Sequence, residues 1–408
     1  MSNTPSPSLP PSLPSPKQAF VPYPVPPGGN PHATEGPLAG LRFAMKDIYD
    51  VAGYPTGCGN PHMLALSGTK TVSAPVMDSL LAAGAAFAGK VITDELAFSI
   101  NGHNSHFGAP LNGAAPDRNT GGSSTGSASV VSTGLVDFAI GSDTGGSVRA
   151  PASHCGLVGL RPTHDRISLA GCMPLAPRFD TCGWFARDMK TFARVGAVLL
   201  GDDPAPVRSP RWLVAEDVLE LVPPETLAVF RATLEKLAPR IGTPEPVRAN
   251  CGIPFDTLYW AFRHLQGVEA WQSHGATIER HGLQLGPGVK ERFAWSRDMA
   301  PVEIGRHLAV ERDLRERLGQ LLADDGILLM PTMPDVAPLR AAPEAGLDDY
   351  RNRAIRMLCL SGFSGFPQIS LPLMQLGGVP LGLSLMGPAG SDRTLIEISA
   401  SLFECRTP

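Results

Sequence analysis

The sequence lacks any long run of charges of one sign. Its 34 Lys and Arg residues stand against 38 Asp and Glu residues, which gives a formal net charge of −4. A nucleic-acid or anionic-membrane partner normally requires a basic stripe, and none is visible. The apolar stretches are also short, because Ser, Thr and Gly interrupt them before they reach the ~20 residues of a membrane helix. We therefore expect neither a nucleic-acid partner nor a membrane partner.

Cysteine is scarce and irregularly placed. The chain has seven cysteines, an odd number, and no CxxC pair, so we expect reduced thiols rather than disulfides or a structural zinc site. No Lys or Arg precedes Lys17, and no apolar segment marks a signal peptide, so the expected location is cytoplasmic. His103 and His106 lack an evident third ligand nearby, and we expect no metal and no cofactor.

Proline dominates the beginning of the chain. Residues 1–27 contain ten prolines, a composition that cannot bury enough apolar surface to fold alone. We therefore expect a disordered Pro/Ser-rich leader over residues 1–35. Over residues 36–408, strand-like and helix-like segments alternate without a clear linker. This alternation predicts an α/β fold, a single large domain with a central mixed β-sheet.

Hydrophobic periodicity places several elements along this domain. A short strand over Arg42–Met45 ends at Lys46. Thr93 is a natural N-cap, so a helix is expected to begin there. Further helices are expected at 72–87, 189–200, 225–241 and 393–403, and further strands at 88–92, 136–140, 212–215, 327–331, 368–373 and 381–386.

The stretch from Gly121 to Pro162 differs from the rest of the chain. It reads GGSSTGSASVVSTGLVDFAIGSDTGGSVRAPASHCGLVGLRP, rich in glycine and serine and nearly free of charge. Flexible linkers share this composition, but the runs VDFAI and GLVGL look like buried strands. Glycine is selected where a backbone takes positive φ or approaches a ligand closely. We interpret the stretch as a tightly folded backbone that presents hydroxyl groups in a dry place.

The sequence matches the motifs of two possible functions of this stretch only weakly. A phosphate-binding Walker loop needs GxxxxGK[ST], yet no lysine occurs between Lys90 and Lys190, and the GxGxxG of dinucleotide-binding folds is missing too. Residues 122–126 formally match GxSxG, which would make Ser124 the nucleophile of an α/β-hydrolase-like esterase. That fold also needs a downstream histidine, and none stands in a clear catalytic context.

A third chemistry pairs serine with lysine. A serine hydroxyl is a poor nucleophile unless a base takes its proton, and a lysine can be that base if burial keeps its amine neutral. Lys46, at the end of an apolar strand, suits this role. Consecutive N–H groups could converge on an oxyanion along the run Thr144, Gly145, Gly146 and Ser147.

The motifs that carry these residues resemble the amidase signature family. They are FAMKDIYD around Lys46, GGSSTGSA at 121–128 and GSDTGGSVRAPASHCGLVGLRPT at 141–163. Blocks such as ITDELAFSINGHNSHFG and MPLAPRFDTCGWFARD extend the resemblance almost end to end, and within the family the chain is most similar to the compact indole-3-acetamide hydrolase type. The resemblance implies helices on both faces of the sheet. Only residues 205–325 match loosely, so we expect a variable helical segment there.

Carried over residue by residue, the resemblance implies a Ser–cis-Ser–Lys triad. Ser147 would be the nucleophile, and Ser123, on a cis peptide bond, would pass its proton to Lys46. The oxyanion hole would consist of the N–H groups of Thr144, Gly145, Gly146 and Ser147. Three further residues would fix the loops by hydrogen bonding: Ser124, Asp143 and Arg149.

The implied activity is hydrolysis of a small primary amide, such as an aryl- or indole-acetamide, to a carboxylate and ammonia through an acyl-enzyme. An apolar pocket would hold the acyl group, and we expect Phe98, Phe179 and Trp184 in its wall. The partner would be this small molecule, and a homodimer is common in similar enzymes. The alternative within the family is a glutaminase-type amidotransferase subunit.

Overall fold

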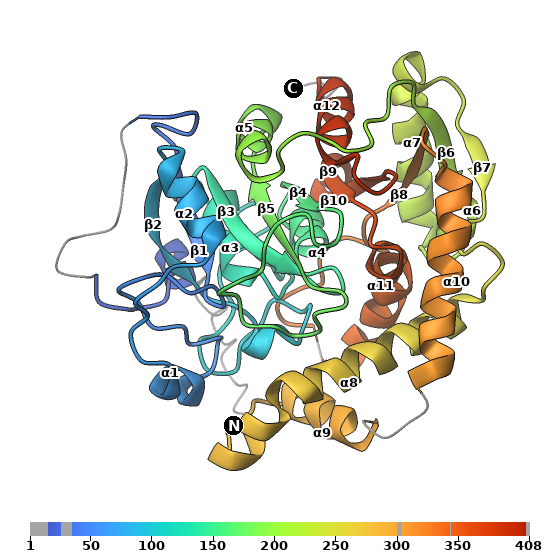
Figure 1. Ribbon diagram of the computed structural model, residues 1–408. Helices are drawn as coiled ribbons and strands as arrows, with labels where there is room; N and C mark the ends of the chain where they lie inside the picture. Colours follow the sequence, from blue (N-terminus) through green and yellow to red (C-terminus); the bar gives the residue numbers. More distant parts are fainter. Residues whose placement is uncertain (1–14, 26–34, 300–303, 343, 405–408) are drawn as a thin grey trace, which may run out of the picture.

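A mixed sheet of ten strands forms the centre of the molecule (Figure 1). The computed structural model describes residues 15–25, 35–299, 304–342 and 344–404. In spatial order the strands are β2 (Ala86–Val91), β1 (Arg42–Lys46), β3 (Phe138–Asp143), β5 (Thr181–Ala186), β4 (Val158–Arg161), β9 (Gln368–Leu376), β10 (Val379–Met386), β8 (Gly326–Pro331), β6 (Arg211–Ala215) and β7 (Glu245–Val247).

The two margins of the sheet are parallel and its middle is antiparallel. Strand β1 pairs in parallel with both β2 and β3, and β6 pairs in parallel with β7 and β8. From β3 through β5, β4, β9 and β10 to β8, every neighbouring pair is antiparallel. The predicted α/β fold with a mixed sheet is confirmed.

Helices cover both faces of this sheet. Side chains along a strand point alternately to its two faces, so each central strand contributes residues to the core on both sides. In β5, Trp184 stacks on Phe192 of one helix layer, whereas the next residue, Phe185, packs in the core of the opposite face. The first layer contains α2 (Pro75–Ala82), α5 (Met189–Leu199), α7 (Pro224–Ile241) and α12 (Asp392–Phe403). The opposite layer contains α3 (Thr125–Ser132), α4 (Arg149–His154) and α10 (Ile304–Leu322).

Three helices pack against one another beside the opposite layer: α8 (Phe255–His281), α9 (Val289–Met299) and α11 (Glu344–Ser364). The remaining elements are short: 3₁₀ turns η1 (Pro16–Ala19) and η2 (Glu95–Ala97), and helices α1 (Pro61–Ser67) and α6 (Glu216–Leu219). The segment expected to be helical at 205–325 therefore also contributes strands β6 and β7 to the sheet.

The structure departs from the expected elements mainly around the Gly/Ser-rich stretch. The prediction of a helix beginning at Thr93 is wrong. Only the 3₁₀ turn η2 forms there, because Leu96 (φ 49°) and Ala97 (φ 57°) take left-handed conformations. Helices α3 and α4 were not predicted. Their side chains are buried almost all round, so they show no alternation of apolar and polar faces.

Part of the expected leader packs on the sheet. Of residues 1–35, residues 1–14 and 26–34 lie outside the described residues. Residues 15–25 are described, and they run beside the sheet margin formed by β2. The Val21 N–H donates to Lys90 O at 3.0 Å, and the Ile92 N–H donates to Ala19 O at 2.9 Å. Ala19 is fully buried against α3, so this part of the leader belongs to the fold.

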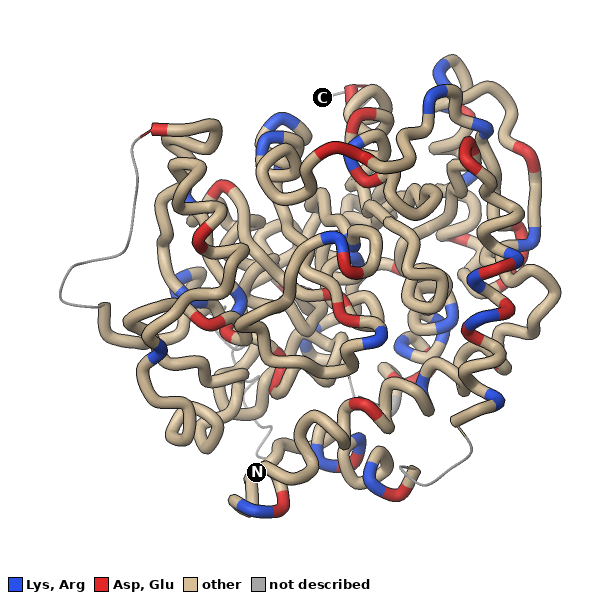
Figure 2. Tube along the Cα trace, in the orientation of Figure 1, with Lys and Arg blue, Asp and Glu red and all other residues tan. Residues whose placement is uncertain are grey.

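Charges of both signs are interspersed along the outer helices, as Figure 2 shows for α10. Within the described part of the chain, every helix is too short or too polar to span a bilayer.

The close packing of the central strands gives a test of the fold. A Cβ at Gly183 of β5 would lie 2.2 Å from the backbone oxygen of Leu160 in β4. We expect Gly183→Ala to lower the free energy of unfolding by about 1–3 kcal/mol, because neither strand can move away without breaking the ladder. The control is Gly305→Ala on α10, where nothing lies within 4 Å of the added Cβ and the change should be neutral or stabilising. Urea denaturation of both variants measures this, and equal effects would contradict the packing described.

Candidate active site

Strand β1 carries Lys46 into the interior at its last residue. The side chain is fully buried, and its Nζ donates to Ser123 Oγ at 2.7 Å and to Ser142 Oγ at 2.9 Å. Burial lowers the pKa of Lys46 to about 8, although nearby groups, including Cys172 and Asp94, oppose the shift. A lysine with such a pKa has a neutral amine in a sizeable fraction of molecules near neutral pH, which an amine base requires.

Ser123 lies in a loop that Asp94 holds in place. The peptide bond between Gly122 and Ser123 is cis, as the resemblance implies. The Asp94 N–H donates to Ser123 O at 3.0 Å, and the Asp94 carboxylate accepts from the Thr125 hydroxyl. A Cβ at position 122 would lie 2.2 Å from Asp94 Oδ2, so only glycine fits there. The fully buried Ser123 is thus fixed against Lys46.

Ser147 lies in the turn between β3 and α4. It is almost fully buried, lines a pocket, and its carbonyl accepts from the Ser124 N–H at 3.3 Å. This hydrogen bond ties the Ser123 loop to the Ser147 turn. Gly146 precedes it with φ +116°, and an added Cβ would lie 2.4 Å from Leu358, so the turn requires glycine.

The carboxylate of Asp143 organises the whole turn. It accepts from the backbone N–H groups of Gly146 (2.9 Å), Val148 (3.1 Å) and Arg149 (3.2 Å) and pairs with the buried guanidinium groups of Arg149 (2.8 Å) and Arg161 (3.1 Å). Burial by itself would raise the pKa of Asp143, but the two arginines and the N–H donors hold it well below its usual range. The carboxylate therefore stays charged and rigid.

The expected set of oxyanion donors is only partly available. The Gly146 N–H points at Asp143 Oδ1, so in this structure it is engaged in holding the turn. Thr144, Gly145 and Ser147 all line the pocket, and their N–H groups are the remaining candidates from the expected set.

Ser124, Asp143 and Arg149 lie where they could fix loop geometry. The Ser124 hydroxyl donates to Ser142 O at 3.1 Å and accepts from the Ser142 N–H at 3.2 Å. Arg149 Nη1 donates to Leu358 O at 2.9 Å and to Gln368 Oε1 at 2.6 Å, which connects the turn to α11 and β9.

The sequence reasoning missed three residues of this network. Ser142 is the second acceptor for Lys46. Arg161 Nη1 donates to the carbonyls of Asp143 (2.6 Å) and Thr144 (3.2 Å), and Asp180 accepts from the Thr144 hydroxyl at 2.6 Å. Each lies inside a motif quoted above. For Ser142 and Arg161 the signal was a polar or charged residue close to a predicted buried strand, whereas no strand was predicted beside Asp180.

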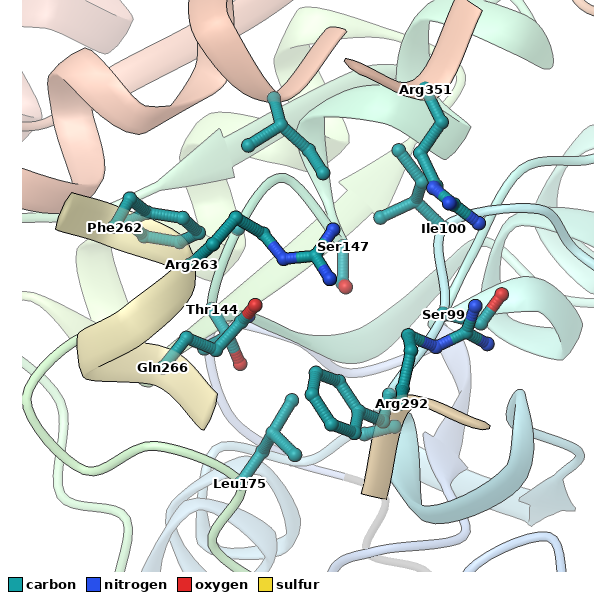
Figure 3. A pocket seen from close by; sticks show the side chains of 14 residues that line it. Ser99, Ile100, Thr144, Ser147, Leu175, Phe262, Arg263, Gln266, Arg292 and Arg351 are labelled. Atoms are coloured by element: carbon teal, nitrogen blue, oxygen red, sulfur yellow. The ribbon is translucent and has the colours of Figure 1, made fainter. Parts of the chain in front are cut away.

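The pocket in front of Ser147 is small and opens to solvent (Figure 3). Its apolar wall includes Phe98, Ile100, Leu175, Phe262 and Ile355. Its polar lining includes Ser99, Thr144, Gln266, Arg263, Arg292 and Arg351.

Of the three expected wall residues, only Phe98 lines this pocket. Phe179 lies behind the wall: it is fully buried, with its ring 4.7 Å from that of Phe262. Trp184 is also fully buried and stacks on Phe192 in the core between β5 and α5. These two expectations are corrected. Phe262, Leu175 and Ile355 line the pocket in their place, although none of the three was among the expected wall residues.

The histidines lie outside this network. No described residue lining the pocket is a histidine. His106 Nε2 lies 2.8 Å from Glu95 Oε1, whereas His103 is exposed, and no cluster of metal-ligating side chains forms among the residues described.

Comparisons with known proteins agree on one family. The family model described as Amidase matches residues 29–237. Amidase 1 of Arabidopsis thaliana is 40% identical over 394 residues, which cover 90% of this chain and 93% of that protein. Amidase 1 of Oryza sativa subsp. japonica is 36% identical over 401 residues, covering 92% of each. A crystal structure of an amidase has a TM-score of 0.82 at 29% identity and covers 91% of this chain and 86% of that one.

The role of Asp143 can be tested through stability. We expect Asp143→Asn to lower the free energy of unfolding at pH 7 by about 3–5 kcal/mol, because it leaves two buried guanidinium groups without their counter-ion. The folded-state pKa is depressed, so the contribution of Asp143 is present above ~4 and lost as pH falls toward the folded value. Denaturation at several pH values measures both effects.

The control for this variant is Asp349→Asn. Asp349 pairs with Arg353 at 2.8 Å, but its side chain is 77% exposed, so the change should stay within ~0.5 kcal/mol. If Asp143→Asn were as mild as this control, Asp143 would not organise the turn.

Proposed function

The chain belongs to the amidase family, and its similarity to the Amidase 1 proteins supports a hydrolase acting on linear amides. On that premise we propose that it cleaves the C–N bond of a small primary amide at Ser147. One observation carries this proposal: the buried Lys46 amine lies 2.7 Å from Ser123 Oγ, in a loop hydrogen-bonded to the turn of Ser147. That arrangement supports a base and a relay beside a nucleophile.

The proposed first step transfers a proton. When the Lys46 amine is neutral, the Ser123 hydroxyl can donate to it and can accept the proton of Ser147 as that oxygen attacks the amide carbon. Backbone N–H groups of the 144–147 turn would stabilise the oxyanion. The same relay then returns a proton to the leaving nitrogen, ammonia departs, and Ser147 keeps the acyl group as an ester. Water activated by the same pair releases the carboxylate, so no cofactor is needed.

The pocket supports an acyl group with an apolar or aromatic part. Phe98 and Phe262 contribute aromatic rings, and Ile100, Leu175 and Ile355 complete the apolar wall. This is compatible with an aryl- or indole-acetamide-like amide. We propose a cytoplasmic enzyme that assembles as a homodimer, with an amidase domain over residues 36–408 against which residues 15–25 of the Pro-rich leader pack.

Two alternatives are separable by experiment. A glutaminase-type amidotransferase subunit would need its complex, tRNA and ATP, whereas the proposed enzyme releases ammonia alone. An esterase using Ser124 fits the contacts poorly, because both hydrogen bonds of the Ser124 hydroxyl go to the Ser142 backbone.

The nucleophile can be identified by covalent labelling. A fluorophosphonate probe should label Ser147, and Ser147→Ala should lose label and at least ~10³-fold of kcat. Peptide mapping locates the label, and ammonia release measures activity. Ser127→Ala is the control, since that hydroxyl only bonds Ile140 O at 2.9 Å. Label on Ser124 with activity surviving in Ser147→Ala would refute the triad.

The state of Lys46 should show in the pH profile. We expect kcat/KM to rise with pH through a limb near 8, because Lys46 acts once it has lost its proton and its pKa is about 8. Ser142→Ala should move the limb to lower pH by roughly half a unit to one unit, since it removes a hydrogen bond that favours the charged amine. Ser127→Ala should leave the limb in place. A profile flat across this range would argue against Lys46 as the base.

A further inference from the structure

Three arginines reach the pocket of Ser147, each from a different helix. Arg263 comes from α8, Arg292 from α9 and Arg351 from α11. Figure 3 shows their side chains directed toward the space beside Ser147. No Asp or Glu occurs among the described residues that line this pocket. The lining is therefore strongly cationic, which a neutral primary amide does not require.

The described surroundings of Arg263 and Arg351 offer little compensating negative charge. Arg263 forms no ion pair with a described carboxylate, and its guanidinium lies 5.1 Å from the ring centre of Trp295 and 5.9 Å from that of Tyr259. Arg351 pairs with Asp348 at 2.8 Å, but that carboxylate is 61% exposed, so solvent screens it. The buried Nε of Arg351 has no hydrogen-bond partner in the described part of the chain.

Holding the charges of Arg263 and Arg351 near each other is unfavourable. Burial lowers the pKa of Arg263 and Arg351 adds to this shift, whereas Tyr259 and Asp348 oppose it. A bound anion would relieve this repulsion. Guanidinium groups present planar pairs of donors that match a carboxylate, and such hydrogen bonds are among the strongest in proteins.

We propose that the physiological substrate is an acid amide: it carries a carboxylate, held by Arg263 and Arg351, in addition to the amide that Ser147 attacks. The inference rests on the proposed function and specifies its substrate class. Hydrolysis breaks the amide C–N bond, releases ammonia and leaves a dicarboxylate. A free amino-acid amide such as glutamine fits less well, because its ammonium group would meet arginines and no carboxylate among the described residues that line the pocket.

Matched substrates test the proposal on the wild-type enzyme. Succinamate is compared with its neutral methyl-ketone analogue, and para-carboxy-phenylacetamide with para-acetyl-phenylacetamide, so that each pair differs mainly in charge. We expect kcat/KM for the carboxylate member of at least one pair to exceed that of its neutral partner by about tenfold or more. Increasing salt should reduce this preference.

Variants assign the preference to the arginines. Arg263→Gln and Arg351→Gln should each reduce, by about tenfold, the ratio of kcat/KM for the preferred carboxylate to kcat/KM for its neutral partner. An unchanged midpoint of urea denaturation shows that the variants still fold. Arg263→Lys should recover part of the loss. The matched control is Arg280→Gln on the exposed end of α8, which should change neither rate.

A binding measurement separates this inference from the catalytic proposal. In Ser147→Ala, calorimetry should show the carboxylate amide binding more tightly than its neutral partner, independently of turnover. Equal affinities and equal rates within both pairs would overturn the inference and leave amide hydrolysis standing. Hydrolysis of no primary amide, together with no probe label at Ser147, would instead defeat the proposed function, and the inference with it.

Discussion

The buried amine of Lys46 is the constraint on which the site depends. A cation at this position would be costly in a fully buried setting, and two serine hydroxyls are the groups that contact it directly. Burial makes the neutral form accessible and so makes Lys46 a usable base. The same burial requires that nearby loops exclude water, and the networks centred on Asp94 and Asp143 fix those loops. The burial of Lys46 thus underlies both its proposed role as a base and the close packing of the loops around it.

The charge of Asp143 stabilises a backbone turn that lacks the regular hydrogen bonds of a helix or a strand. The turn after β3 cannot form helix or strand, because Gly146 has positive φ and the chain reverses direction. Its N–H groups instead converge on a carboxylate that two buried arginines keep ionised. Arg149 extends the support to α11 and β9, so a helix and a strand distant in the sequence help to fix the position of Ser147.

Much of the fold followed from the sequence, because strands such as β1 and β8 are short apolar runs bounded by turns. The amphipathic helices α5 and α7 were also predicted closely. Helices α3 and α4 escaped prediction because they are buried on all sides and rich in small residues, so no periodicity marks them.

The proposed catalytic residues were predicted from the sequence better than the pocket wall was, for a similar reason. Lys46, Ser123 and Ser147 belong to compact motifs, and the structure places them in one region. The pocket wall is assembled from α8, α9 and α11, whose contributions depend on tertiary packing. Trp184 illustrates the difference: its neighbours in the sequence lie near the site, but strand alternation turns its side chain into the opposite core. Which face a strand residue occupies could not be read without the register of the sheet.

The short segment of residues 15–25 beside β2 has a consequence for the molecule as a whole. Strand β2 is the terminal strand of the sheet on that side, and such a strand offers free backbone groups to any other chain. Ala19 and Val21 occupy part of that row, since they bond to Ile92 and Lys90. A chain without residues 15–25 would expose the unpaired backbone groups of β2 and promote pairing with another chain. The proline-rich beginning therefore contributes to keeping the sheet closed to other chains.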